Sequence, residues 1–307
     1  MKRSISHWSA WGQYIAVAAA YEAVYEIARY CSQPQFLLTT GLRLACMLLM
    51  PARFWPALAV GEFVPLAENA LFCADRFGTA WAVLIAIPTV VFYWPVLGMV
   101  RSKWRLYDAD GRLHMQVIVY ASIVASIITA GLITATWMAA FMHDPGKFPA
   151  HDPTMVLVSR LVGSYLGALT LTPVILSLRD RYLRRQDVLT VAAVWRSTLL
   201  RDILWWVIPA LAVLDWLALT ANVESVRQLA QFALLLPVLG LAWRHGWHGT
   251  AVGGLLASFA LASTAHGLLD NETLKVQTVM SVVLSGALIL GARSPATRRM
   301  TEADQGP

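Results

Sequence analysis

Apolar stretches of about 20 residues recur along the whole chain, and this feature most constrains what the chain can fold into. A helix of that length crosses the roughly 30 Å of hydrocarbon in a bilayer. Hydrophobic residues make up 58% of the sequence and charged residues only 14%, whereas soluble domains carry about 25% charged residues. The apolar surplus is therefore lipid-facing surface rather than a large core. We predict an all-α, polytopic integral membrane helical bundle, because the short alternating segments of a transmembrane barrel are absent.

The apolar stretches divide into about ten predicted transmembrane spans. The second is short enough to be re-entrant or tilted, and the fifth is long enough to extend beyond the bilayer. We expect residues 1–292 to form one membrane-embedded sensor-like domain and residues 293–307 to form a short disordered cytoplasmic tail. The predicted spans are residues 12–30, 36–51, 54–72, 79–100, 115–142, 154–178, 203–221, 228–243, 249–267 and 275–292.

The basic residues predict the orientation of the chain. If the spans alternate, nearly all loop Lys and Arg residues fall on one side, and the other side receives only Arg76, Lys147, Arg227 and Lys275. The richer side is cytoplasmic, so both termini are predicted to be cytoplasmic in a bacterial inner membrane. This bias also explains the net charge of +6 and argues against nucleic acid as a partner. The basic stretch 179–202 is predicted to be an amphipathic helix along the inner surface, which contacts anionic lipids or docks a partner.

Ionisable residues within the predicted spans give the main functional signal. A charge at the bilayer centre costs about 2.5–3.5 kcal/mol, so these side chains should face a polar interior and some should pair. Glu62 is predicted to face Arg43 or Arg160. We expect a polar pocket among the first, second, third and sixth spans, open to the periplasm and able to bind a small ligand or ion. Its candidate residues are Glu22, Glu26, Arg29, Arg43, Glu62, Glu68 and Arg160.

A packing role for the same charges remains open, because they nearly balance and could form buried ion pairs that only fix helix packing. The loop 143–153 repeats His-Asp-Pro, which could bind a metal, but proline-rich turns give the same pattern and no metal site is predicted. A disulfide between Cys31 and Cys73 is also open. The sequence has no Walker motif, nucleophile elbow or HExxH motif, so we predict a protein that is not an enzyme, with no catalytic residues and no cofactor.

Three stretches also carry a family resemblance. They are GLRLACMLLMPARFWPALAVGEF (41–63), LVGSYLGALTLTPVIL (161–176), and LLLPVLGLAWRHGWHGTAVGGLLASFALASTAHG (234–267) followed by LKVQTVMSVVLSGALILGA (274–292). In this order and spacing they resemble the first family of bacterial membrane-associated sensor domains, abbreviated MASE. The resemblance implies structural roles for Gly41, Trp55, Pro56, Gly61, Gly163, Gly167, Pro173 and Gln277.

The chain departs from the family pattern in two places. The family usually has Trp-Pro-Pro-x-Gly where LLTTG stands at 37–41, and it usually has Gly-Asp where Gly163 is followed by Ser164. The signal sensed could therefore differ from that of other members.

The resemblance implies a bacterial inner-membrane sensory module. Family members feed their last helix into a histidine kinase, a PAS domain, or domains that make and break cyclic-di-GMP. Here the sensor domain is expected without an attached output, so it should signal to a partner such as a histidine kinase of a two-component system or a cyclic-di-GMP enzyme. Whether it forms a homodimer is open. The alternatives are a secondary transporter that uses the same pocket, against which no inverted repeat is evident, and a non-sensing membrane assembly protein.

Overall fold

The computed structural model describes residues 2–33, 35–104, 106–107, 113–146, 152–185, 197–265 and 270–293, and these ranges contain helices but no strand. The predicted all-helical class is thus confirmed. The first half of the chain forms α1 (Lys2–Tyr30), α2 (Leu38–Leu49), the 3₁₀ turn η1 (Ala52–Phe54), α3 (Trp55–Phe77), α4 (Thr79–Ala86), α5 (Thr89–Lys103), α6 (Met115–His143) and α7 (Pro153–Arg185). The second half forms α9 (Thr198–Asp202), the π-helical turn η2 (Ile203–Val207), α10 (Ile208–Thr220), α11 (Glu224–Ala233), α12 (Leu235–Ser263) and α13 (Asn271–Arg293).

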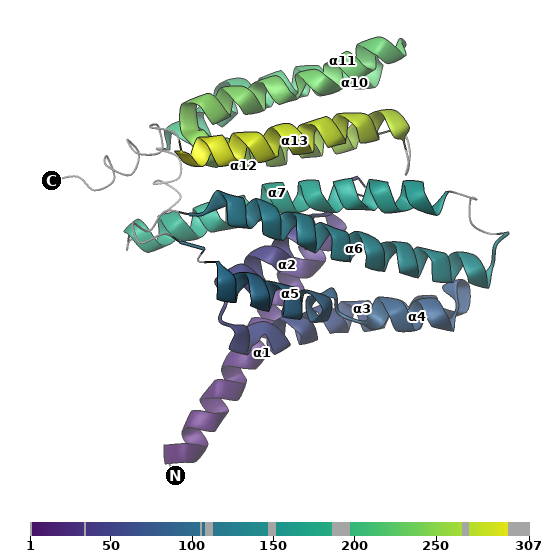
Figure 1. The fold of residues 1–307 in the computed structure, drawn as a ribbon, viewed down its shortest axis with the longest axis vertical. Coiled ribbons are helices and arrows are strands. Elements are labelled where there is room, and N and C mark those ends of the chain that lie inside the picture. The colour runs from purple at the N-terminus through teal and green to yellow at the C-terminus, as the bar shows by residue number, and fades with distance from the viewer. Residues whose placement is uncertain are drawn as a thin grey trace.

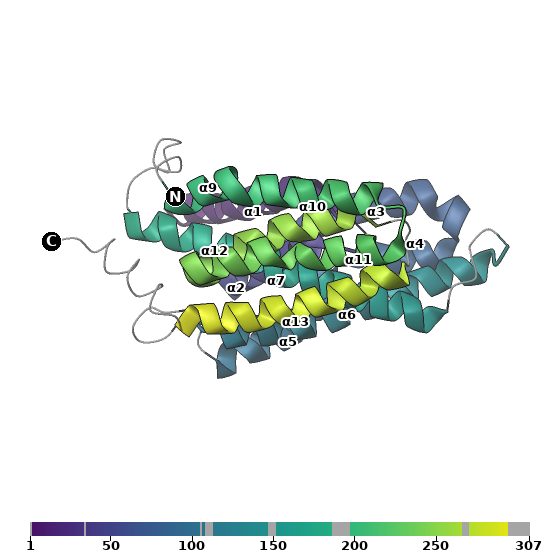
Figure 2. The same cartoon turned by 90° about the horizontal axis from the view of Figure 1, so that it is seen from above.

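The long helices lie side by side in one bundle, whereas α1 crosses obliquely and its first turns project from the side (Figures 1 and 2). The first turn of α1 and the last turn of α13 lie toward the same end of the bundle in both views. The stretch 186–196, which is the middle of the predicted surface helix 179–202, and the tail 294–307 lie outside the described residues, whereas 179–185 belong to α7 and 198–202 form α9.

Six helices among the described residues are long and apolar enough to cross a membrane, and a seventh span results if the bent pair α4 and α5 counts as one. The predicted number of ten spans is therefore not confirmed. The helix α2 is apolar but short, as expected for the second predicted span, and α1 falls outside the six. The six are Ala52–Phe77, Met115–His143, Pro153–Asp180, Thr198–Thr220, Glu224–Ser263 and Asn271–Ala292.

The helix α12 contains a chain reversal at Gly246, where the backbone takes φ 59° and ψ −143°. A Cβ added to Gly253 would lie 3.5 Å from the Cα of Val238, although 15 residues of straight helix extend about 22 Å. The side chain of Gln231 likewise donates a hydrogen bond to Thr264 at 3.0 Å. The gap between the predicted spans 228–243 and 249–267 therefore contains a turn, which separates two antiparallel arms.

Glycines allow the tightest helix crossings. A Cβ added to Gly41 would collide with the carbonyl oxygen of Gly167, and one added to Gly167 would collide with the carbonyl oxygen of Leu37. The same crossing of α2 and α7 holds two long-range hydrogen bonds, from the Leu37 N–H to the Gly163 carbonyl at 3.1 Å and from Thr172 to the Gly41 carbonyl at 3.0 Å. In the same way Gly61 on α3 faces the backbone of α1. Helices in lipid gain close packing from such small residues.

We expect Gly167→Ala to destabilise the protein by about 1–3 kcal/mol, because the new methyl group meets backbone that cannot rotate away. The matched control is Gly131→Ala on α6, where an added Cβ has no neighbour within 4 Å and helix propensity improves by up to about 1 kcal/mol. Unfolding in detergent measures both. Equal stability of the two variants would contradict the close crossing of α2 and α7.

Candidate functional site

The helices α4 and α5 are separated by a break at Ile87 and Pro88, where the direction of the helix axis changes by 41°. A proline disfavours helical backbone at the residue before it, and Ile87 is extended, with φ −76° and ψ 117°. The break leaves the first N–H groups of α5 without partners inside the helix. Within a bilayer such groups must find protein partners, because no water reaches them and each unsatisfied group costs several kcal/mol.

The carboxylate of Glu62 on α3 supplies those partners. The backbone N–H of Thr89 donates to Oε1 at 3.3 Å, and that of Val90 donates to Oε2 at 3.2 Å. The Glu62 side chain is fully buried. A helix N-terminus carries a partial positive charge and presents free N–H groups, so an anion is the favoured partner there.

The second partner of Glu62 is Arg43 on α2. Its Nε donates to Oε2 at 3.2 Å and its Nη2 donates to Oε1 at 2.5 Å, so the pair is bidentate. The guanidinium is 3% exposed and lies over the rings of Tyr93 and Tyr25, at 5.5 and 5.9 Å from their centroids. Each carboxylate oxygen therefore accepts one hydrogen bond from Arg43 and one from α5.

We call Arg43, Glu62 and the first two residues of α5 the Arg43–Glu62 junction. Tyr93 extends it to α6, because its hydroxyl donates a hydrogen bond to the carbonyl of Ala125 at 2.9 Å and can accept one from the Thr129 hydroxyl at 2.6 Å. Tyr25 brings α1 into contact with the same guanidinium. A single buried ion pair thus links five helices: α1, α2, α3, α5 and α6.

The structure does not gather the seven predicted pocket residues into one buried pocket. Glu26 and Arg29 pair with each other at 3.1 Å on α1, with side chains 46% and 40% exposed. Glu68 is exposed, because it follows Glu62 by six residues and so points about 240° around the helix from it. Glu22 on α1 and Arg160 on α7 are half-buried. Of the two partners predicted for Glu62, the structure selects Arg43.

Most of the residues singled out by resemblance lie at helix contacts, whereas Pro56 is exposed. Trp55 is buried and packs edge-on against Trp94 at 5.6 Å between ring centroids. Pro56 occupies the first turn of α3, and Pro173 lies inside α7. Gln277 on α13 is buried, and its amide donates to the carbonyl of Gln35 at 3.1 Å.

Sequence reasoning missed the contribution of α5 to the site. The available signal was the Ile-Pro step at 87–88 within an apolar stretch, which predicts a break and hence free N–H groups. The tyrosines Tyr25 and Tyr93 were also missed.

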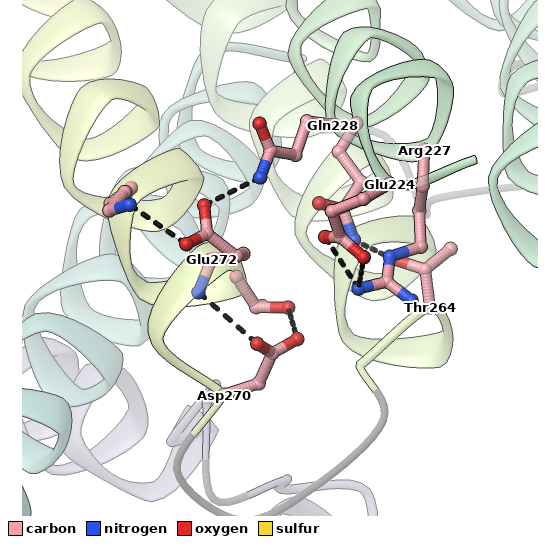
Figure 3. Close-up of polar contacts among 9 residues, drawn as sticks. Glu224, Arg227, Gln228, Thr264, Asp270 and Glu272 are labelled. Atoms are coloured by element: carbon pink, nitrogen blue, oxygen red, sulfur yellow. Dashed lines mark hydrogen bonds and ion pairs between the residues drawn. The ribbon is translucent and has the colours of Figure 1, made fainter.

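Polar clusters lie at both ends of the helices formed by the second half of the chain. At the Gly246 turn, the Asp202 carboxylate contacts His245 at 2.8 Å and Arg244 at 3.1 Å. Figure 3 shows the opposite end, where Glu272 on α13 accepts a hydrogen bond from Gln228 on α11 at 2.6 Å. There the ion pairs of Glu224 with Arg227 and of Glu272 with Lys275 join neighbouring turns of one helix.

Neither a metal site nor a disulfide is formed by the residues that the structure describes. They contain no group of three or more His, Cys, Asp or Glu that could hold a metal ion, and His151 of the repeated His-Asp-Pro motif lies outside them. Cys31 and Cys73 are free thiols.

We expect Glu62→Gln to destabilise the protein by about 3–5 kcal/mol, because it leaves the Arg43 charge buried without its counter-ion. The matched control is Glu26→Gln, which breaks an exposed pair and should cost less than about 1 kcal/mol. Unfolding in detergent measures both variants. The double variant Arg43→Met/Glu62→Gln should recover part of the loss, and a double variant that loses the sum of both single effects would argue against direct coupling.

Comparison with known proteins agrees with this architecture. The MASE1 family model matches residues 10–298. The chain is 26% identical over 270 residues to the signal transduction histidine-protein kinase/phosphatase UhpB of Salmonella typhimurium, an alignment that covers 86% of this chain and 48% of that protein. The chain thus spans about half the length of the curated relative it matches. No solved structure matches. The resemblance seen in three sequence stretches is confirmed, and the chain belongs to the MASE1 family of membrane sensory domains.

Proposed function

We propose that this chain is a sensory input module of a bacterial inner membrane that couples a small ligand or ion to a signalling partner through the Arg43–Glu62 junction. Membership of a family of membrane sensory domains supports the sensory role. The relative is named a histidine-protein kinase/phosphatase, which supports a kinase of that class as the partner or output.

The observation that carries the proposal is that the Glu62 carboxylate has two structural roles. It neutralises Arg43 on α2 and holds two N–H groups of α5 at the same time. If the carboxylate is neutralised or displaced, α2 keeps a buried cation and α5 loses its N-terminal partners. The helices must then repack as a unit, which is what a two-state sensor requires. A signal of this kind needs a difference in affinity of only about 1–3 kcal/mol between the two states.

The geometry favours a small anion as the ligand. Such an anion could replace the Glu62 carboxylate between Arg43 and the start of α5. A ligand that only filled apolar space would leave the four hydrogen bonds of Glu62 intact, so it would not alter the arrangement of the junction.

A secondary transporter is the second candidate, and the broken pair α4 and α5 is the observation that favours it. Transporters bind substrates near the bilayer midplane at the ends of discontinuous helices. Uptake by proteoliposomes under a proton gradient separates the two functions, because a sensor moves no substrate.

A thermal-shift screen of the purified protein against metabolites and inorganic ions over a range of pH tests the sensory site. A ligand at about 100 times its dissociation constant should add about 2.7 kcal/mol of stability. We expect the shift in wild type and in Glu68→Gln, whose exposed carboxylate lies on the same helix, but not in Glu62→Gln. A ligand that stabilises Glu62→Gln as much as wild type binds elsewhere and contradicts the site. A screen without any shift, together with a plainly less stable Glu62→Gln, would assign the junction to packing alone.

A further inference from the structure

The two most exposed tryptophans among the residues whose burial is described lie near the Gly246 turn. Trp243 on α12 is 88% exposed and Trp205 in η2 is 79% exposed. Each lies beside an arginine: Arg244 follows Trp243 and has a side chain 57% exposed, and Arg201 precedes Trp205 by one helical turn and is also exposed. Tryptophan and arginine together are typical of the depth at which a bilayer changes from hydrocarbon to headgroups.

The two pairs lie at the same depth on neighbouring helices. A Cβ added to Gly240 would lie 2.6 Å from the ring of Trp206, and Asp202 contacts Arg244 at 3.1 Å. These two contacts fix the antiparallel register of the segments 201–206 and 240–244. Arg201 and Arg244 therefore lie near the ends of apolar helices, where lipid headgroups are found.

The charges around Arg244 leave it able to bind a further anion. The Asp202 carboxylate is shared between Arg244 and His245, and one Nη of Arg244 reaches it. A guanidinium has five N–H donors in a planar arrangement that matches a phosphate. Since Asp202 contacts one Nη, most of the Arg244 donors can bind a further anion from the exposed side. With Arg201 one residue before Asp202, the local charge is net positive.

We infer that Arg201 and Arg244 form a binding site for the phosphate of an anionic phospholipid headgroup, with Trp205 and Trp243 flanking its glycerol region. A lipid is favoured over a soluble anion because the exposed neighbours Leu204, Ile208 and Leu239 continue the surface with apolar side chains. The site is separate from the Arg43–Glu62 junction and stands without the sensory proposal.

A lipid bound here would act on the end of α13 through the hairpin turn. A Cβ on Gly291 of α13 would lie 2.7 Å from the backbone nitrogen of Trp247 and 2.9 Å from the carbonyl carbon of Gly246. His245, with which Arg244 shares the Asp202 carboxylate, directly precedes Gly246 along the chain. A headgroup bound at Arg244 would therefore act directly beside the Gly246 turn, against which α13 packs.

Native mass spectrometry of the detergent-solubilised protein, titrated with phosphatidylglycerol and with phosphatidylcholine, tests the site. We expect phosphatidylglycerol to bind about fivefold more weakly for each arginine removed in Arg201→Gln, Arg244→Gln and the double variant. Phosphatidylcholine binding should not change, because its headgroup is zwitterionic. The matched control is Lys275→Gln at the opposite end of the bundle, since Lys275 is 61% exposed and pairs with Glu272 as Arg244 pairs with Asp202.

Arg201→Gln keeps the test decisive if Arg244→Gln does not fold, because it leaves the Asp202 contacts in place. Unchanged phosphatidylglycerol affinity in folded Arg201→Gln would overturn the site. An equal loss in Lys275→Gln would also overturn it, because the effect would then report net charge alone. Unchanged lipid affinity with a changed oligomeric state would assign the two arginines to a protein contact instead.

Discussion

A backbone N–H group inside a bilayer has no water to bind, and this constraint determines the centre of the structure. The break at Pro88 exposes the N–H groups of Thr89 and Val90 at the start of α5, and only a strong acceptor can satisfy both. Glu62 is that acceptor. Its charge then requires Arg43, and the buried guanidinium in turn contacts the rings of Tyr25 and Tyr93. Residues of α1, α2, α3, α5 and α6 therefore meet around the ion pair at this one helix break.

Buried ion pairs are poor sources of net stability but costly to break from one side, because the surviving charge stays buried. That asymmetry suits a sensory element better than an apolar contact would. An apolar contact loosens gradually, whereas the Arg43–Glu62 junction is either complete or leaves a cation and two N–H groups unsatisfied together. At the crossing of α2 and α7, Gly41 and Gly167 leave the two backbones in close contact, so we expect a movement of α2 to reach α7.

The sequence predicted the helical class, the turn near Gly246 and a partner for Glu62, because hydropathy, glycine and the cost of buried charge act locally or through composition. It did not predict that Glu68 is exposed or that Glu26 and Arg29 pair at the surface, since every intramembrane charge was assumed to face one interior. The break at Pro88 was not predicted either, because an X-Pro step such as Ile87-Pro88 signals a break without deciding it. Pro65, Pro95 and Pro173 lie inside continuous helices, and whether a proline ends a helix depends on tertiary partners for the freed backbone groups.

Hydrogen–deuterium exchange of the first turn of α5 tests the central claim most directly, with wild type compared with Glu62→Gln and with Glu68→Gln on the same helix. If the carboxylate holds the start of α5, the amides of Thr89 and Val90 exchange slowly in wild type and in Glu68→Gln. They should exchange much faster in Glu62→Gln, while the core of α7 stays protected. Equal protection of these amides in all three proteins would contradict the account, because the helix break would then be stable without the carboxylate.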